Sequence, residues 1–537
     1  MRDDEMGLSG HMRCRESGLG TVNPTQHYFY HPPLDGLFST YQFKSRGLVV
    51  PVRYCEHFHF LFLIRRVAQM DPLRLSLNPN KQLKEEFVSN LTGSSMLEIA
   101  SLSTIVPILM VLRHWNCTDH SNVISLKKKD DLPSGIKIWR DNIAVLLMDF
   151  LWVILPILSA FTVLSDWANL CAAFLISILL IFFLVKRYVF SSSYRSKEKS
   201  ETVYAIRSFV SSYRVSMMIV TCLCILAVDF KIYPRRYAKT ETYGTGLMDL
   251  GVGSFVVANA LVSRQARNVT SVKWKDAIRS VSPLLLLGIA RLIFTAGVDY
   301  QVHVGEYGVH WNFFFTLAAI SLLTSILSIH SRYSGLLGIL ILIGYQIFLM
   351  CGLNNYLLSN ERTKNIVSQN KEGLFSIFGY WGMYLIGVQL GNHLFFAHTQ
   401  CKQSRSIQWT RMSIWIVCIL FWLMTIFLDK FVERVSRRMC NLGYVTFVLA
   451  QNFQVLAILS LSDLIPGSKL SLLEEAFNRN LLGLFVLANI LTGVINLTVD
   501  TLSASPLVSF FILVLYTLTL SLFGGFALLA SIRLKFW

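Results

Sequence analysis

The sequence is poor in charged residues. They make up 15% of its 537 residues, whereas hydrophobic residues reach 53%. A soluble chain carries about a quarter charged residues. This imbalance excludes an ordinary soluble protein and indicates a polytopic membrane protein, in which one bundle of helices absorbs nearly the whole chain.

Cysteine pairs at metal-binding or redox spacing are also missing. The ten cysteines are scattered, none forms a CxxC motif, and several lie inside apolar runs. The pattern indicates neither a disulfide framework nor a zinc site. We therefore expect no bound metal, and no cofactor that stays bound permanently.

The N-terminal region has no apolar segment with the flanks of a signal peptide. Residues 1–80 are polar, contain the Pro-rich HPPL, and hold one apolar run, HFHFLFLI, that is too short to span a membrane. We divide the chain into this polar extension and a multi-span membrane domain, residues 81–537. We expect the extension to be disordered or dispensable. Because Met70 begins a stretch that reads like a natural start, residues 1–69 are expected to be either a dispensable tail or an over-extended start.

A net charge of +17 does not here indicate a nucleic-acid partner. The basic residues fall in short loops between apolar runs, where they set the orientation of the spans. We expect membrane lipids, and no nucleic acid, around this chain. The sequence indicates no particular protein partner.

Thirteen stretches are apolar enough for α-helical spans, each of which needs roughly 20 residues. The predicted fold is an all-α bundle of about 13 transmembrane helices, of which the fourth to sixth have the weakest patterns. The cores are 95–112, 142–164, 168–185, 215–229, 245–262, 282–298, 311–329, 335–353, 374–396, 412–428, 442–463, 480–498 and 506–530.

The loops after odd-numbered spans and the C-terminal tail carry most of the loop Lys and Arg. The positive-inside rule places these loops in the cytosol. The C-terminus is then cytosolic and the N-terminus lies in the lumen or outside. The loop that begins at Asp229 is expected on the non-cytosolic side.

That loop is the most polar connection between two spans, DFKIYPRRYAKTETYGTGLMDLGVG at 229–253. Placing an acid, two arginines and a lysine at the membrane surface is costly unless they are used. We predict the active site here. On residue chemistry alone, a plain interfacial salt bridge is the competing interpretation.

Other polar residues fall on the same predicted side and suggest one composite site. His310 is the other plausible base, although a lone His beside a span is more often an interfacial hydrogen-bonding group. Asp249, inside the fifth span, is expected to form a structural ion pair with Arg291. The remaining residues assigned to substrate binding are Glu241, Tyr243, Glu306, Trp311, Asn312, Asn370, Arg437, Arg438 and Asp500.

Six runs occur in order along residues 81–537. They are KEEFVSNLTGSSMLEI (84–99), VDFKIYPRRYAKTETYGTGLMDLGVGSF (228–255), EYGVHWNFFFT (306–316), NKEG (370–373), VSRRMCNLGY (435–444) and NILTGVINLTVDT (489–501). Together they resemble the glycosylphosphatidylinositol (GPI) inositol acyltransferases of the PIG-W type. The run at 228–255 is long enough to be highly specific, whereas residues 1–80 have no counterpart.

The resemblance implies a multi-pass enzyme of the endoplasmic reticulum membrane with thirteen spans. Its expected reaction moves a palmitoyl-type chain from acyl-CoA, as co-substrate, onto the inositol ring of glucosaminyl phosphatidylinositol. In that family an acid and a lysine of the 228–255 run are catalytic, and they correspond here to Asp229 and Lys239.

The chemistry of these residues suits acyl transfer. Asp229 is positioned for a raised pKa if it is partly desolvated, which favours a general base. Pro234 breaks the helix so that Lys239 can fold back, either to stabilise the oxyanion or to act as the charge partner of the acid. Arg235 and Arg236 are expected to bind phosphate, or otherwise to lie at the interface as snorkelling side chains.

Two other classes of protein were weighed. A secondary transporter would show paired halves and polar groups in mid-span, and neither is visible. A non-catalytic scaffold would tolerate loss of the Asp229 charge. The HWNCTD segment at 114–119 matches an H-x4-D acyltransferase pattern, but chance matches are common and it lies on the opposite predicted face.

One question remains open at this level, because acyl-CoA is made in the cytosol. Either the donor reaches the site through the bundle or the predicted orientation is inverted.

Overall fold

The structure is a computed structural model that describes residues 86–87, 89–116, 135–190, 201–269, 274–297, 304–327, 329–359, 361–396, 407–465 and 470–532. The expected N-terminal extension lies outside these ranges. Within them every regular element is a helix, and the predicted all-α polytopic fold is confirmed.

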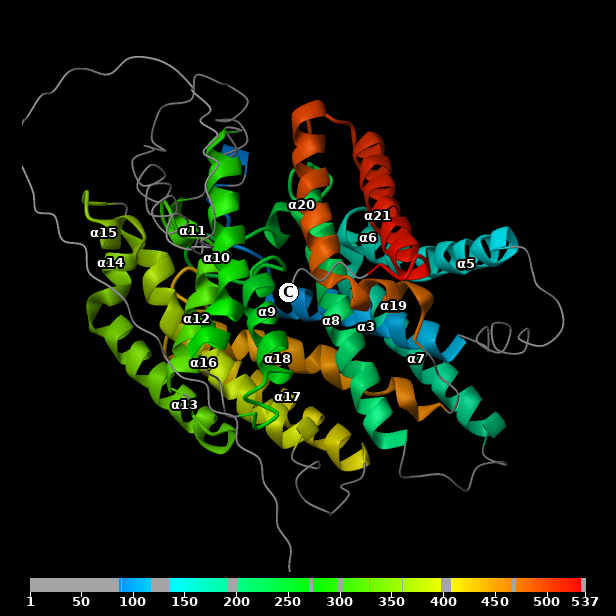
Figure 1. Ribbon diagram of the computed structural model, residues 1–537, viewed down its shortest axis with the longest axis horizontal. Helices are drawn as coiled ribbons and strands as arrows, with labels where there is room; N and C mark the ends of the chain where they lie inside the picture. The colour runs from blue at the N-terminus through cyan, green and yellow to red at the C-terminus, as the bar shows by residue number, and fades with distance from the viewer. Residues whose placement is uncertain are drawn as a thin grey trace, which may run out of the picture. The chain divides into compact units, whose positions relative to one another are not determined.

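All thirteen predicted stretches fall on helices (Figure 1). Ten described helices are long and apolar enough to cross a membrane by length and composition, and the other three stretches coincide with α9, α10 and α12. The helices of the thirteen stretches are α3 (Met96–Asn116), α5 (Gly135–Asp149), α6 (Leu155–Phe161), α7 (Ala168–Phe190), α8 (Glu201–Ala227), α9 (Leu250–Leu261), α10 (Trp274–Gly297), α12 (Phe313–Leu327), α13 (Ser331–Phe348), α16 (Lys371–Gly391), α17 (Ile407–Phe431), α18 (Leu442–Leu459), α20 (Leu481–Thr498) and α21 (Pro506–Leu529).

Short elements extend or connect these helices. The π-helical turns η1 (Phe150–Ile154), η4 (Leu349–Leu353) and η5 (Asn392–Phe396) continue α5, α13 and α16. The short helices are α11 (Val304–Tyr307), α14 (Asn354–Leu358), α15 (Ile366–Gln369) and α19 (Leu472–Arg479). Three of these four, α11, α14 and α15, surround the polar region described below.

Helix α18 is the most enclosed candidate span. Of its most apolar window 83% is buried, against 17% for α7. It contacts α3, α8, α9, α16 and α17, and its Tyr444, Phe447 and Phe453 side chains are fully buried. A helix that is apolar all round belongs in a core. The turn that precedes α18 is therefore surrounded by several other segments.

Small residues let the central helices approach closely. A Cβ atom on Gly253 of α9 would come within 2.7 Å of the Val448 side chain of α18. A Cβ atom on Gly379 of α16 would come within 2.1 Å of the Cys440 carbonyl oxygen. Membrane helices use small residues in this way because packing, and not the hydrophobic effect, holds them together.

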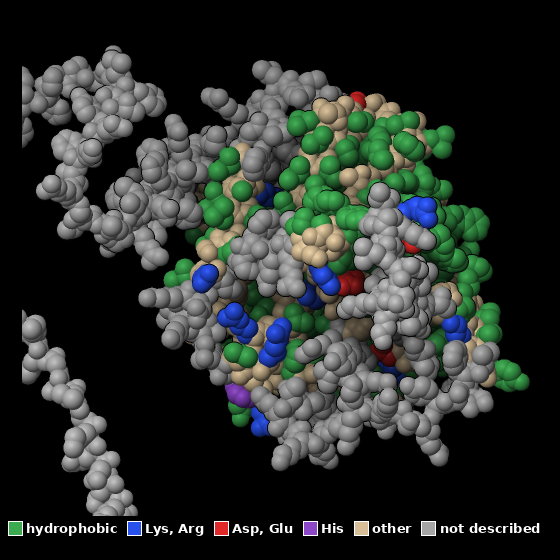
Figure 2. Space-filling view, turned by 45° about the vertical axis from the view of Figure 1, so that its right-hand side comes forward, with side chains coloured by type: hydrophobic (Ala, Val, Ile, Leu, Met, Phe, Trp, Pro, Cys, Tyr) green, Lys and Arg blue, Asp and Glu red, His purple; other side chains and the backbone are tan. Residues whose placement is uncertain are grey.

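The outer helices present apolar side chains outward. Large hydrophobic residues on α7, α13, α17 and α21 are exposed, for example Phe174, Ile339, Leu423 and Phe511. Figure 2 shows hydrophobic side chains over much of the described surface, with charged side chains gathered in a few patches. This distribution suits helices that face lipid.

Candidate active site

The loop between α8 and α9 folds back on itself. The Met248 N–H donates a hydrogen bond to the Tyr237 carbonyl at 3.0 Å. The Thr240 N–H and hydroxyl donate to the two carboxylate oxygens of Asp249 at 3.0 and 2.9 Å. These bonds hold the loop as a compact unit between the two helices.

Asp229 follows the last turn of α8 and is 4% exposed. Its Oδ2 accepts a hydrogen bond from Nδ2 of Asn496, in the last turn of α20, at 2.7 Å. The Arg235 guanidinium donates to the Val228 carbonyl at 2.7 Å, which folds the chain back beside Asp229. The carboxylate is thus held between the ends of α8 and α20.

Lys239 has a different partner. Its Nζ donates to both carboxylate oxygens of Glu306, on α11, at 2.8 and 3.0 Å. Burial lowers the pKa of Lys239, helped by Arg437 and Arg291 and opposed by Glu306. Although burial raises the pKa of Glu306, Lys239 and Arg437 bring it down to about 2. Glu306 is therefore ionised at neutral pH and pairs directly with Lys239.

Arg437 extends this pair into a longer series. Its Nε donates to Oδ1 of Asp249 at 2.8 Å, and its Nη1 lies 3.4 Å from Oε1 of Glu306. Burial lowers the pKa of Arg437, but Glu306 and Asp249 outweigh it and raise this pKa. Asp249, Arg437, Glu306 and Lys239 alternate in sign, and we call them the charge chain.

The expected partner of Asp249 was Arg291, and the structure corrects this. Asp249 forms its ion pair with Arg437, 188 residues further along, while Arg291 acts electrostatically on Lys239 and Glu306. The reason is the central position of α18. The turn before it reaches Asp249 at the start of α9, a proximity that the sequence does not display.

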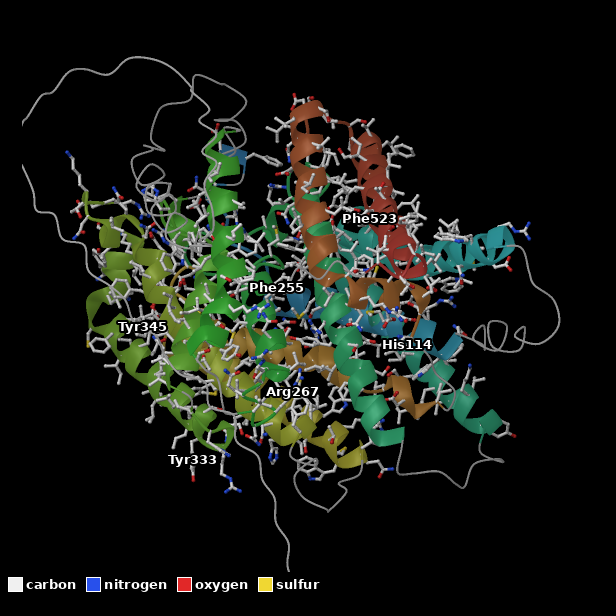
Figure 3. All side chains as sticks on the ribbon, in the orientation of Figure 1. His114, Phe255, Arg267, Tyr333, Tyr345 and Phe523 are labelled. Carbon is white, nitrogen blue, oxygen red and sulfur yellow. The ribbon has the colours of Figure 1, made fainter. Side chains whose placement is uncertain are left out.

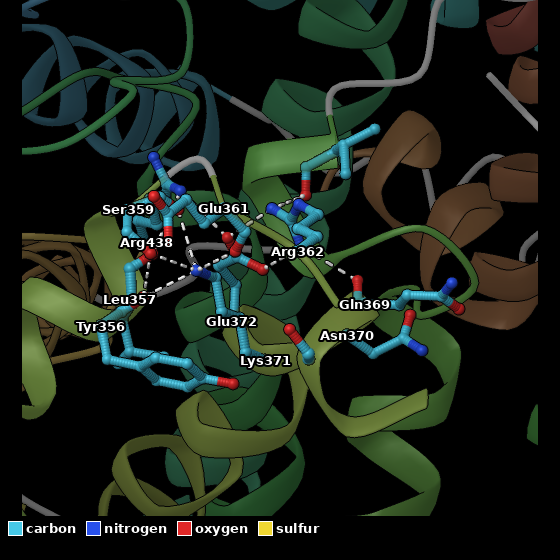
Figure 4. A network of polar contacts seen from close by, with 12 residues as sticks. Tyr356, Leu357, Ser359, Glu361, Arg362, Gln369, Asn370, Lys371, Glu372 and Arg438 are labelled. Carbon is cyan, nitrogen blue, oxygen red and sulfur yellow. Dashed lines mark hydrogen bonds and ion pairs between the residues drawn. The ribbon is translucent and has the colours of Figure 1, made fainter. Parts of the chain in front are cut away.

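Arg438 belongs to a second network, shown in Figure 4. Its Nη2 donates to Oε1 of Glu372 at 2.9 Å, and Arg362 binds the same carboxylate through Nη2 at 2.6 Å and Nη1 at 3.0 Å. Lys371 donates to the carbonyls of Tyr356 and Ser359 at 2.6 and 2.8 Å. The last contacts satisfy carbonyls at the C-terminal end of α14.

The two networks meet at the tandem arginines. Arg437 is a member of the charge chain, and its neighbour Arg438 binds Glu372 in the second network. The turn that carries both arginines therefore links the two networks. Gly308, with φ +107°, packs so tightly that a Cβ atom would come within 2.5 Å of Cα of Asn370. A side chain at this left-handed position would also be strained, so glycine is required here.

His310 and Asn370 lie at the same junction. The His310 backbone N–H donates to Oδ1 of Asn370 at 2.7 Å. Burial lowers the pKa of His310, opposed by a hydrogen bond with Gln369. The imidazole is therefore mainly neutral at pH 7, and its catalytic role stays a prediction.

The two loop arginines already have protein partners. The Arg235 guanidinium stacks over the Phe87 ring, 3.8 Å from its centroid, and burial lowers its pKa to about 10. Arg236 donates to Glu98 at 2.9 Å and to Asp166 at 2.7 Å. These contacts tie the loop to α3 and to the segment before α7. Phosphate binding by either arginine stays a prediction.

Three further predicted residues lie in loops of the described structure. The Tyr243 hydroxyl donates to Glu433 at 3.2 Å, and burial together with Glu433 raises its pKa to about 12. The Glu241 N–H donates to the Leu91 carbonyl at 3.1 Å. Asp500 is exposed in the turn after α20, where its Oδ1 accepts a hydrogen bond from the Leu502 N–H at 3.2 Å.

Trp311 and Asn312 help to start α12. Oδ1 of Asn312 accepts a hydrogen bond from the Phe314 N–H at 3.0 Å, as an N-capping residue does. Trp311 donates from Nε1 to the Thr316 hydroxyl at 3.0 Å. Both are placed as structural groups of this helix end, and their predicted substrate contacts stay predictions.

The structure joins all six runs that the sequence singled out. Glu98, in the first run, accepts a hydrogen bond from Arg236 of the second run. The Thr245 hydroxyl of the second run donates to the Ser94 carbonyl of the first. Asn496, from the last run, contacts Asp229, and the other three runs meet at the tandem arginines. The sequence did not assign Asn496 or Glu98 to the site. Each of these two residues is a polar residue near a span end and inside a matched run, and this pattern could have assigned both to the site.

The H-x4-D segment lies elsewhere. His114, on α3, has its Nε2 2.6 Å from Oε1 of Glu474, while Asp119 lies outside the described residues. Figure 3 shows His114 well apart from Tyr345, whose hydroxyl binds the Met439 carbonyl beside the tandem arginines. Within the described residues, no group of His, Cys, Asp and Glu side chains is arranged as metal ligands.

Comparison with known proteins gives a consistent set of relatives. The model of the GWT1 family matches residues 80–527. An uncharacterized protein of Arabidopsis thaliana is 52% identical over 435 residues, 80% of this chain and 98% of that protein. The phosphatidylinositol-glycan biosynthesis class W protein of Dictyostelium discoideum is 33% identical over 84% of this chain and 98% of its own length. GPI-anchored wall transfer protein 1 of Candida albicans is 34% identical, over 82% and 96% respectively.

Proposed function

We propose that this chain, which belongs to the GWT1 family, is an O-acyltransferase of GPI-anchor biosynthesis in the endoplasmic reticulum membrane. It moves a palmitoyl-type chain from acyl-CoA to the inositol ring of glucosaminyl phosphatidylinositol. The names of two relatives, one in phosphatidylinositol-glycan biosynthesis and one in GPI-anchored wall transfer, support this assignment.

The observation that carries the proposal is the unequal exposure along the charge chain. The Lys239 side chain is 38% exposed, while those of Glu306 and Arg437 are 13% and 5% exposed. The Lys239 side chain, at one end of the charge chain, is thus the most exposed of the three. Together with Arg291, three cations face two carboxylates, so the site favours an anion. Preorganised positive charge is what a developing oxyanion requires.

We propose the following reaction for Asp229 and Lys239. Asp229 takes the proton of an inositol hydroxyl as its oxygen attacks the thioester carbonyl carbon. The carbonyl oxygen gains negative charge, which the Lys239 ammonium stabilises. The carbon–sulfur bond then breaks, the ester remains on the inositol, and the proton passes from Asp229 to the departing CoA thiolate. Asp229 is thereby ready for another cycle, with no other reactant consumed.

The setting also suits an acceptor that is a membrane lipid. Asp229 and Asn496 lie at the ends of two candidate spans, where a lipid headgroup meets protein. The charge chain lies in this polar region, while the outer helices present apolar side chains. A lipid can therefore keep its chains beside the helices while its inositol reaches the loop.

The test is an assay of microsomes from a host that lacks its own activity of this kind. With the full chain present, acyl-CoA and a glucosaminyl phosphatidylinositol analogue are expected to give an analogue heavier by one acyl group, with one CoA released per product. An analogue that crosses the membrane unchanged would identify a transporter. An unmodified analogue in a correctly expressed sample would indicate a scaffold.

A further inference from the structure

Glu306 occupies the middle of the charge chain. Its carboxylate accepts two hydrogen bonds from Nζ of Lys239, at 2.8 and 3.0 Å, and lies 3.4 Å from Nη1 of Arg437. It comes from α11, a helix of four residues that packs against α16. Because this helix is so short, the Glu306 carboxylate matters for its contacts with Lys239 and Arg437 and not for the stability of the helix.

The groups that act on Lys239 come from several elements. Glu306 reaches it from α11, Arg437 from the turn before α18, and Arg291 from α10. Asp249, at the start of α9, lies behind Arg437 and binds it. Glu306 is the carboxylate in direct contact with the ammonium, whereas both arginines repel it.

Arg437 is anchored independently of Glu306. Besides its bond to Asp249, it donates to the Thr240 carbonyl at 3.3 Å. The Tyr444 hydroxyl in turn donates to the Asp249 carbonyl at 2.7 Å. Arg437 therefore stays beside Lys239 when the Glu306 charge is removed, and the repulsion remains.

We propose that Glu306 is a positioning residue that keeps the Lys239 ammonium protonated and in place for acyl transfer. This inference rests on the proposed function, because it concerns the lysine that faces the oxyanion there. Glu306 acts through Lys239 and does not itself contact the reacting atoms.

The physical reason is a balance of charges. Burial lowers the pKa of Lys239, the two arginines lower it further, and Glu306 opposes them. Loss of Glu306 leaves only the lowering influences, so the lysine releases its proton at lower pH. A neutral amine offers no net charge to the oxyanion. Glu306, with a pKa of about 2, stays ionised through the range of any assay.

The test compares kcat against pH for the wild-type chain and for Glu306→Gln in microsomes. The alkaline limb of the variant is expected to shift to lower pH by about one to three units, the usual effect of a nearby opposite charge. Activity should recover as the pH is lowered. The acidic limb and the KM for the lipid acceptor should change little, because Glu306 of the wild-type chain stays ionised at acidic pH and its carboxylate is engaged by Lys239 and Arg437.

Glu372→Gln is the matched control. It removes a buried carboxylate from the neighbouring Arg438 and Arg362 without touching Lys239. General loss of packing would shift both variants alike, whereas the inference predicts a shifted alkaline limb for Glu306→Gln alone. If Glu306→Gln does not accumulate or is inactive throughout, Glu306→Asp replaces it, with a smaller shift expected in the same direction.

An unshifted alkaline limb in an active Glu306 variant would overturn the inference, as would an equal shift in Glu372→Gln. Either result leaves the proposed function intact if Lys239→Ala is inactive. Full activity of Lys239→Ala would instead remove the proposed role of the lysine itself, which separates the two failures.

Discussion

At the residue scale, the position of the Asp229 carboxylate depends on a side chain 267 residues away. Nδ2 of Asn496 donates to its Oδ2, and the same amide donates to the Thr492 carbonyl at 3.1 Å. Asn496 is therefore fixed by its own helix and holds one carboxylate oxygen. This contact fixes the orientation of the carboxylate, which the proposed proton transfer requires.

Asn496→Leu tests this role with a side chain of similar size. A hydrogen bond to a charged group contributes about 1.5–3 kcal/mol, so kcat is expected to fall by roughly ten- to hundredfold. Asn489→Leu, which removes an exposed amide that bonds only within α20, is the control and should retain activity. Equal kcat values for the two variants would exclude a special role for Asn496.

Sequence reasoning predicted many of these residues singly but not their pairing. Lys239, Glu306 and Arg437 were each recognisable as polar groups at the ends of apolar stretches. Their contacts join positions 67 to 188 residues apart, which depends on how the helices pack. Asp249 illustrates the limit, since the sequence suggested a nearby arginine and the fold supplied a distant one.

At the element scale, α9 must lie close to α18 for the charge chain to form. Gly253 faces Val448 and the Tyr444 hydroxyl, at 2.7 and 3.2 Å from a hypothetical Cβ, and both side chains are buried. Gly251, two residues earlier on the same helix, has no atom within 4 Å of such a Cβ. Gly253 therefore tests the close packing of α9 against α18, and Gly251 serves as its control.

Gly253→Ala is expected to cost about 1–3 kcal/mol through overpacking and to lower both thermal stability in detergent and acylation activity. Gly251→Ala should preserve both, because alanine favours a helix over glycine by up to about 1 kcal/mol. Melting temperature and microsomal activity are the measurements. Similar values for the two variants would contradict the close α9–α18 contact.

The elements themselves were predictable where apolar runs were long. All thirteen stretches became helices, because only helices satisfy backbone groups in lipid. Helix α19 and the short helices α11, α14 and α15 were not predicted, since four to eight residues carry too little periodicity. The π-helical turns were invisible as well, because their apolar sequences do not differ from helical ones.

At the scale of the whole molecule, the tandem arginines before α18 join segments from most of the chain. Arg437 holds Asp249 and Glu306, and Arg438 holds Glu372. Residues from four of the matched runs are thus linked, and their acting together as one composite site stays a prediction. The orientation of these networks in the membrane still rests on the distribution of Lys and Arg in the loops.

Single cysteines report that orientation. Lys231→Cys, exposed in the α8–α9 loop, is expected to react with an impermeant reagent only after microsomes are opened. Arg264→Cys, exposed after α9, should react in sealed microsomes, with the wild-type chain as the background. The reverse pattern would invert the topology and place the site where acyl-CoA is made.

The most direct test of the account is acylation of the lipid analogue by Asp229→Asn and Lys239→Ala at wild-type expression. Asp141→Asn and Lys231→Ala, which change exposed residues of the same types, are the controls. Each site variant is expected to lose at least about a hundredfold in kcat, as loss of a general base or an oxyanion donor does, while the controls stay active. Full activity in both site variants would contradict the assignment of the active site to this loop.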